Sequence, residues 1–138
     1  GLQDNLRFTG RVRLDDYLPR LDAIALTSIS EAQPLTILEA GAAGIPTVAT
    51  DVGSCRELLL GRDDEEPRLG PGGAVTPLAS PADTAAELAR LIGDWEWRER
   101  CSRAIRQRVA RYYNKSEIDR IYGDLYRDLR NRASAKAA

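Results

Sequence analysis

The sequence predicts an α/β fold, with a parallel sheet of about four strands, helices on both faces and two C-terminal helices. Over the first two thirds of the chain, short apolar runs alternate with helical patterns, as in strand–helix–strand units. From Asp94 onward only helical periodicity remains. With 138 residues the chain is long enough for one domain with its own core. We expect a core over residues 1–94 and helices of the same domain over 95–138.

The expected strands are four apolar runs, at residues 6–9, 23–28, 47–50 and 73–76. The helices among them are expected at residues 15–21, 34–43 and 55–60. A turn-rich acidic loop over 62–71 separates the last of these helices from the fourth strand. A complete doubly wound half has about five or six strands, so we expect N-terminal strands to be missing.

Residues that favour helix ends support these boundaries. Gly44 follows the 34–43 helix as a C-cap, and Pro46 comes soon after it. Ser54 and Glu57 have the spacing of a capping box at the start of the 55–60 helix, which Gly61 ends. A further helix begins where Ser80 can cap it, with Pro at the first helical position.

Two helices are expected after Asp94. The first covers residues 95–112, where Trp95 and Trp97 are expected to anchor it against the sheet. Asn114 caps the second, which reaches about Arg130, and the tail beyond it is expected to fray. Apolar residues of the second helix recur at i, i+3, i+4 and i+7, namely Ile118, Ile121, Tyr122, Leu125 and Leu129.

Composition excludes several kinds of chemistry. The chain contains no His, so an imidazole base or ligand within it is excluded. It contains no Met, so we expect a fragment or a processed product. No run approaches the roughly 18 apolar residues that cross a bilayer, and no secretory leader precedes the first strand, so a cytoplasmic location is expected. Cys55 and Cys101 form neither a disulfide framework nor a metal-type cluster.

Charge is unevenly distributed along the chain. Residues 1–95 carry 8 basic and 15 acidic side chains, whereas residues 96–138 carry 12 basic and 6 acidic ones. The arginines of the basic part follow helical spacing, which favours a solvated helix face over a nucleic-acid partner. The alternative is a contact surface for another domain or for lipid headgroups at a membrane. These arginines are Arg98, Arg100, Arg103, Arg106, Arg108 and Arg111.

The segment from Ser28 to Asp51 carries the strongest functional signal. The second expected strand ends at Ser28, a loop follows, and a helix begins at Pro34. In open α/β sheets, ligands bind at the carboxyl ends of strands, where this loop lies. The amides of Leu35 and Thr36 face out of the helix N-terminus beside its positive dipole end, which suits a phosphate or diphosphate.

Two glutamates flank this helix start. Glu31 lies in the loop, and Glu39 follows after seven intervening residues, within the helix. A carboxylate accepts hydrogen bonds at two oxygens, which suits the paired hydroxyls of a sugar ring. On their own the two residues also fit a simpler interpretation, in which Glu39 lies on the helix surface and Glu31 faces the helix dipole.

The run SISEAQPLTILEAGAAGIPTVATDVG resembles the Glu-x7-Glu motif of family-4 retaining glycosyltransferases of the GT-B fold. Its form is similar to that of enzymes of exopolysaccharide synthesis. The resemblance implies a Rossmann-like, incomplete half of a GT-B fold that binds a UDP- or related nucleotide-activated hexose. It implies no metal and no cofactor besides this substrate.

The resemblance also implies roles for individual residues. Glu39 matches the glutamate that holds the ribose hydroxyls, and Glu31 matches the catalytic one near the donor sugar. The stretch that faces the diphosphate and sugar is matched by Gln33, Pro34, Leu35 and Thr36. Two departures are Ala32, where members of the family usually have Gly, and Gly41, which indicates close packing or flexibility.

In this family an upstream Arg/Lys pair neutralises the departing diphosphate, and a separate N-terminal domain binds the acceptor. Both are expected before Gly1. The alternatives are a non-catalytic module that binds a nucleotide or sugar phosphate, and a receiver-like α/β interaction module. A receiver would need several aspartates at strand ends, and only Asp51 is so placed. Asp51 could instead approach the nucleotide, whereas Glu57 is explained by its capping position.

Overall fold

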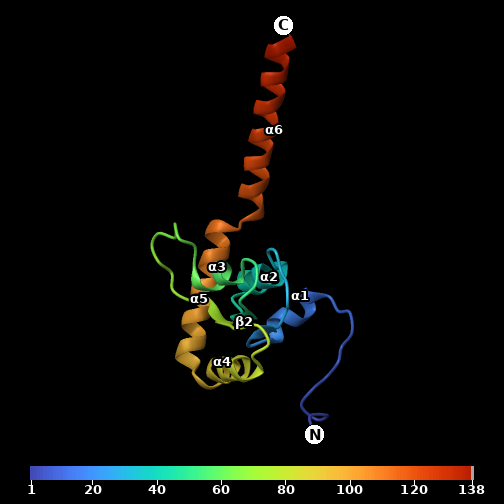
Figure 1. The fold of residues 1–138 in the computed structure, drawn as a ribbon, viewed down its shortest axis with the longest axis vertical. Coiled ribbons are helices and arrows are strands. Elements are labelled where there is room, and N and C mark those ends of the chain that lie inside the picture. The colour runs from blue at the N-terminus through green and yellow to red at the C-terminus, as the bar shows by residue number, and fades with distance from the viewer. Residues whose placement is uncertain (138) are drawn as a thin grey trace.

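The computed structural model of the protein describes residues 1–137. A compact α/β body carries an irregular N-terminal segment and a long C-terminal helix that projects away from it (Figure 1). In chain order the elements are α1 (Leu14–Tyr17), η1 (Leu18–Arg20), β1 (Ile24–Leu26), α2 (Leu35–Ala43), β2 (Thr47–Thr50), α3 (Cys55–Leu60), β3 (Gly73–Thr76), α4 (Pro81–Gly93), α5 (Trp95–Tyr112) and α6 (Lys115–Ala137).

The sheet is parallel and has the order β1-β2-β3. Thr47 of β2 lies opposite Ile24 on one side and Gly73 on the other. The predicted parallel sheet is confirmed, but it has three strands among the described residues rather than four. Residues 6–9 form no strand, and Phe8 remains 90% exposed. A short apolar run becomes a strand only beside a neighbour, and here residues 6–9 have none.

Helices cover both faces of the sheet, as predicted. On one face, α2 and α3 enclose a core with β2 and α5, formed by Ile37, Ala49, Cys55, Leu58, Leu59, Ile105 and Val109. On the other face α4 packs with the beginning of α5, in a core formed by Val48, Ala74, Leu91 and Cys101. Because α5 contributes to both cores, it ties the two layers together.

Gly41 lies where α2 contacts α5. A Cβ at this position would lie 2.7 Å from Cγ1 of Ile105 and 2.8 Å from Cγ2 of Val109. These distances are too short for real contacts, so the glycine permits the two helices to approach closely. Of the two explanations expected for Gly41, close packing is therefore the one that the structure supports.

The predicted helix ends are partly confirmed. Gly44 has a left-handed φ of 78° and ends α2, as expected. Pro34 is the N-cap of α2 rather than its first residue, because its ψ of 114° is extended. Asn114 accepts a hydrogen bond from the amide of Ser116 at 2.9 Å, which confirms its predicted capping role.

Ser54 and Ser80 are the N-cap residues of α3 and α4, as predicted, and Pro81 follows Ser80 in the first turn, but the predicted side-chain capping bonds are absent. The Glu57 carboxylate does not bond back to the start of α3, because it accepts a hydrogen bond from the Tyr113 hydroxyl. The Ser80 hydroxyl donates to Asp83 instead of accepting an amide. For Ser80 the Asp83 carboxylate is a stronger partner than a backbone amide, whereas the Ser54 hydroxyl is buried and finds no hydrogen-bond partner among the described residues.

Helix α6 is longer than predicted. It continues past Arg130 to Ala137, so the expected fraying is not seen within the described residues, and residue 138 lies outside them. The alanine-rich end has high helix propensity, which explains the extension. Among the helices of the described residues, none combines the length and the apolar character needed to cross a bilayer.

The predicted solvated arginine face of α5 is only partly correct. Arg100 and Arg103 do lie at the surface, each near a glutamate one turn earlier. Arg106 instead donates to the Ala43 carbonyl at the end of α2. Arg98 donates to two carbonyls at the end of α4. Arg108 is fully buried. Three of these arginines therefore connect elements of the fold.

Arg108 is paired with Glu65 of the loop before β3. Its Nε and Nη2 atoms donate to the two carboxylate oxygens at 2.6 and 2.9 Å, and both side chains are almost completely buried. The guanidinium also donates to the carbonyls of Leu58, Leu59 and Gly70. The hydrogen bonds from Arg108 hold the pKa of the Glu65 carboxyl below its ordinary value. This pair fastens the 62–71 loop to α5.

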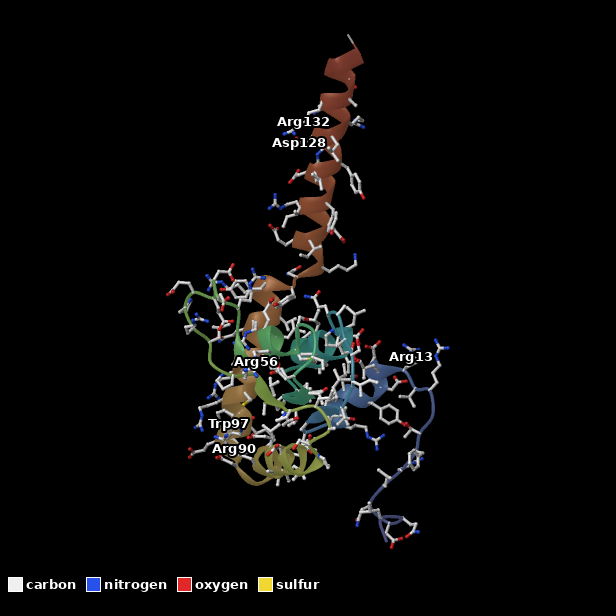
Figure 2. The ribbon with its side chains drawn as sticks, viewed as in Figure 1. Arg13, Arg56, Arg90, Trp97, Asp128 and Arg132 are labelled. Carbon is white, nitrogen blue, oxygen red and sulfur yellow. The ribbon has the colours of Figure 1, made fainter. Side chains whose placement is uncertain are left out.

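The two tryptophans behave differently from one another. Trp97 packs against the core beneath α4, as predicted, and the Arg90 guanidinium lies 3.9 Å from its ring centroid. Figure 2 shows these two side chains together beside α4. Trp95 is 64% exposed, so its predicted anchoring role is wrong.

Candidate functional site

Glu31 lies in the loop that joins β1 to α2, at the carboxyl end of the sheet. The Ser28 hydroxyl donates to Oε1 of Glu31 at 2.6 Å. The carbonyl of Ser28 in turn accepts a hydrogen bond from the hydroxyl of Thr50, the last residue of β2. Glu31 is half-buried. Its carboxylate is thus held at one oxygen and remains accessible.

The N-terminus of α2 has the features of an anion site. No side chain caps it, and its first turn contains no acidic residue. The amide of Ile37 bonds to the Pro34 carbonyl at 3.2 Å, whereas the amides of Leu35 and Thr36 find no acceptor within residues 1–137. Unbonded amides at the positive end of a helix dipole favour a phosphate or another anion.

Glu39 lies one turn further along α2 and is exposed. Residues four apart share one side of a helix, so Glu39 lies on the same side as Leu35, which is itself 66% exposed. Gln33 is exposed in the loop before the helix. The predicted residues thus lie around one helix start, with a carboxylate in the loop and another on the helix.

The other candidate residues at this edge of the sheet are unsuited to a ligand, because Asp51 and Glu57 are hydrogen-bonded to other side chains and Cys55 is buried. The Asp51 carboxylate accepts hydrogen bonds from the Arg56 guanidinium at both of its oxygens, and this bonding raises the pKa of Arg56. Burial raises the pKa of the Cys55 thiol, so this thiol is a poor nucleophile at neutral pH. Glu57 is engaged by Tyr113, whose pKa is raised by burial and by this bond.

Sequence reasoning did not identify the part that the loop after β2 plays. Gly53 has a φ of +54°, and a Cβ there would lie 2.1 Å from the Glu31 carbonyl oxygen. The amide of Ser54 donates to the Ala32 carbonyl at 2.9 Å. The loops after β1 and β2 are therefore in direct contact. The sequence signal for this contact was a glycine placed soon after a strand end.

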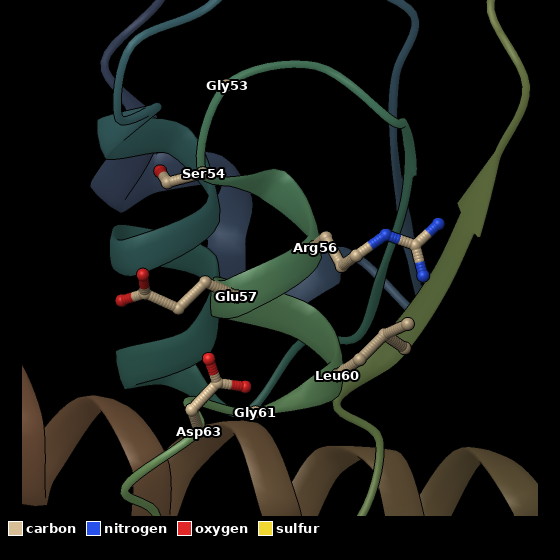
Figure 3. Close-up of a pocket in the computed structure, with 7 residues that line it drawn as sticks. All are labelled: Gly53, Ser54, Arg56, Glu57, Leu60, Gly61 and Asp63. Carbon is tan, nitrogen blue, oxygen red and sulfur yellow. The ribbon is translucent and has the colours of Figure 1, made fainter.

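Two hollows lie near this edge of the sheet. One, of about 610 Å³, is lined by Gly53, Ser54, Arg56, Glu57, Leu60, Gly61 and Asp63. Figure 3 shows the Glu57 and Asp63 carboxylates on one side of α3 and the Arg56 guanidinium on the other, so they do not converge on one ligand. The other hollow, of about 480 Å³, is mostly apolar and includes Thr27, Ile29, Thr50, Leu78 and Leu88. No predicted site residue lines either hollow.

Solved structures and curated proteins resemble this chain. Sucrose-phosphate synthase from Thermosynechococcus elongatus superposes with a TM-score of 0.82 at 26% identity, over 95% of this chain and 32% of that one. The α/β fold thus resembles one half of a GT-B glycosyltransferase, as predicted. The lipopolysaccharide core biosynthesis mannosyltransferase LpsB of Rhizobium meliloti (strain 1021) is 41% identical over 66 residues, 47% of this chain and 19% of that protein.

A D-inositol 3-phosphate glycosyltransferase of Nocardiopsis dassonvillei is 29% identical over 117 residues. That match covers 85% of this chain and 25% of the relative, so the chain spans a quarter or less of the curated relatives that it matches. The family described as glycosyl transferases group 1 matches residues 1–108, which include Glu31, Glu39 and the start of α2. The chain belongs to the glycosyl transferases group 1 family.

Proposed function

We propose that this chain is the donor-binding part of a retaining glycosyltransferase that takes a hexose from a UDP- or related nucleotide sugar. The observation that carries the proposal is the start of α2, where two amides lack an acceptor within residues 1–137, one carboxylate lies in the preceding loop and another lies on the helix. The amides of Leu35 and Thr36 would receive the diphosphate. Glu39 would hold the ribose hydroxyls, and Glu31 would lie at the donor sugar.

The charges of the ligand explain why the amides of α2 would bind the diphosphate and the glutamates would bind hydroxyls. A diphosphate is anionic and is favoured by the helix dipole, whereas neutral hydroxyls donate to carboxylates. When the sugar leaves, negative charge grows on the diphosphate, and further cations must stabilise it. The α2 start supplies amides but no cation of its own, which supports an upstream basic pair as a necessary partner. An acceptor-binding domain is the second partner that we propose.

The biological setting is a further proposal. The form of residues 27–58 is similar to that of the cytosolic glycosyltransferase of the Pel exopolysaccharide system, and one relative is named a lipopolysaccharide core mannosyltransferase. These similarities support a cytoplasmic role in polysaccharide or glycoconjugate synthesis, with peripheral contact at a membrane. The competing function is a module that binds a nucleotide or sugar phosphate without catalysis. Such a module would bind the same nucleotides but would not transfer a hexose.

Calorimetric titration of the full natural chain that carries these residues tests the proposal. UDP, GDP, UDP-glucose and GDP-mannose serve as probes. Glu39→Ala should weaken the binding of the preferred nucleotide and of the corresponding nucleotide sugar about tenfold or more, since a lost hydrogen bond to a charged group costs ~1.5–3 kcal/mol. Glu96→Ala is the matched control, because Glu96 is exposed on α5, away from α2. Binding that is insensitive to Glu39→Ala would contradict the assignment.

A further inference from the structure

A short chain of hydrogen bonds reaches Glu31 from the centre of the sheet. Thr50 ends β2, and its side chain is buried except for 5% of the residue surface. Its hydroxyl donates to the carbonyl of Ser28, and the hydroxyl of Ser28 donates to Oε1 of Glu31. The outermost member of this chain is the carboxylate for which we propose a role at the donor sugar.

The backbone of the same loop is held at a second place. Ser54 donates its amide to the Ala32 carbonyl, directly after Glu31. Beside this bond, Gly53 lies against the Glu31 carbonyl so closely that no side chain fits. The 28–32 loop is therefore fixed at both ends by residues that follow or end β2.

We propose that Ser28, Thr50 and Gly53 are positioning residues for Glu31, which fix its carboxylate for the donor sugar without contacting the nucleotide. This inference rests on the proposed function. A glutamate in a loop has several rotamers, and ordering such a side chain on binding costs free energy. The Ser28 bond removes part of that cost beforehand. It also occupies Oε1, while Oε2 receives no donor within residues 1–137 and is free for a sugar hydroxyl.

If Ser28 positions Glu31, its loss should lower the affinity for nucleotide sugars but not the affinity for nucleoside diphosphates. A nucleoside diphosphate meets the amides of α2 and Glu39, which Ser28 does not contact. A nucleotide sugar also meets Glu31. Ser28→Ala should therefore leave the affinity for UDP or GDP within about twofold and weaken the matching UDP-glucose or GDP-mannose about tenfold, equivalent to ~1.4 kcal/mol. Thr50→Val, which keeps the shape but loses the hydroxyl, should act in the same direction with a smaller effect.

The experiment is calorimetric titration of the full natural chain. Ser28→Thr and Thr50→Ser retain the hydroxyls, so these variants should bind the nucleotide sugar about as tightly as the unmodified protein does. If the alanine and valine variants lost affinity only because a change at these positions unfolds the protein, the conservative variants would lose it too. Thermal melting of each variant checks that the fold is intact. Gly53→Ala should disturb the loop more strongly, and Gly70→Ala is its matched control, since Gly70 also has a positive φ but has open space around it.

The outcomes separate the two ideas. If Glu31→Ala lowers the affinity for nucleotide sugars alone and Ser28→Ala does not, the positioning role is overturned and the proposed function stands. If UDP and GDP affinities fall together with those of the sugars in Ser28→Ala, the residue acts on the whole site and the positioning role is again overturned. If neither Glu31→Ala nor Glu39→Ala changes any affinity, or if no probe binds, the proposed function itself is wrong.

Discussion

Helices α5 and α6 follow one another in the chain, and both carry arginines, acidic residues and an apolar stripe. Their surroundings differ completely. In α5 the stripe is buried, with Ile105 at 1% and Cys101 at 0% exposure. In α6 the corresponding positions are open, with Leu125 at 50% and Leu129 at 52%. The same periodicity thus occurs in a helix that packs against the body and in one that projects from it (Figure 1).

The difference shows that helical periodicity specifies a face but not its partner. The stripe of α5 meets α2, α3 and β3, and its arginines find carbonyls and a carboxylate there. The arginines of α6 pair within their own helix, as Arg120 does with Glu117 and Asp124. Such exposed pairs contribute little to stability, so α6 depends on its intrinsic helix propensity.

The largest expected difference between the helices concerns a buried and an exposed arginine. Arg108→Met in α5 leaves Glu65 buried without its cation, which should lower the free energy of unfolding by ~3–5 kcal/mol. Arg120→Met in α6 removes only exposed pairs and should leave the unfolding midpoint unchanged within error. Urea denaturation followed by circular dichroism measures both. Equal effects would contradict the comparison.

The same pair gives a pH dependence. The pKa of the Glu65 carboxyl is lowered in the folded state, so the stability that it contributes is present above its unfolded pKa, near 4.5. This contribution is lost as the pH falls through the folded pKa. The gap in stability between the unmodified protein and Arg108→Met should therefore narrow below about pH 4.5, since a protonated Glu65 no longer needs a cation.

A glycine pair gives the next largest contrast. Gly41→Ala places a methyl group against Ile105 and Val109 and should lower the free energy of unfolding by ~1–3 kcal/mol through overpacking. Gly123→Ala in α6 meets only the end of Arg127, at an ordinary 3.5 Å. There the alanine should increase helicity and slow amide exchange, since alanine is favoured over glycine in helices by about 1 kcal/mol. A stabilising Gly41→Ala would contradict the close packing.

The smallest expected effect is that of removing α6 itself. Deletion of residues 115–138 should change the free energy of unfolding of the body by less than about 1 kcal/mol, because α6 contributes to neither core. Urea denaturation followed by the fluorescence of Trp95 and Trp97 would measure this change in the free energy of unfolding. A large loss of stability would show that α6 supports the body through contacts in solution.

Much of the fold could be predicted because its signals are local. Gly44 ends α2 through its own backbone conformation, and the apolar run of β2 and the helical periodicity of α5 are patterns of neighbouring residues. Features that depend on distant residues could not be predicted. Glu57 has capping-box spacing, but its actual partner is Tyr113, 56 positions later. A strand over residues 6–9 needs a neighbour that its own sequence does not specify.

In the candidate site, too, some residues could be predicted from local sequence and others depend on contacts with distant residues. Glu31, Glu39 and the start of α2 lie within one short segment, so their spacing could be interpreted directly. Gly53 contacts the Glu31 carbonyl from a different loop, and Thr50 reaches Ser28 across 22 positions. Only the pairing of β1 with β2 brings these residues together, and this pairing is a property of the whole sheet.

The pairing of Glu65 with Arg108 has a consequence for biosynthesis. These residues are 43 positions apart, so at ~5–20 residues per second the ribosome adds Arg108 roughly 2–9 s after Glu65. During that interval the apolar faces of α2 and α3 have been made, but the helix that covers them has not. The nascent chain therefore passes through a stage in which Ile37, Leu58 and Leu59 lack part of their cover.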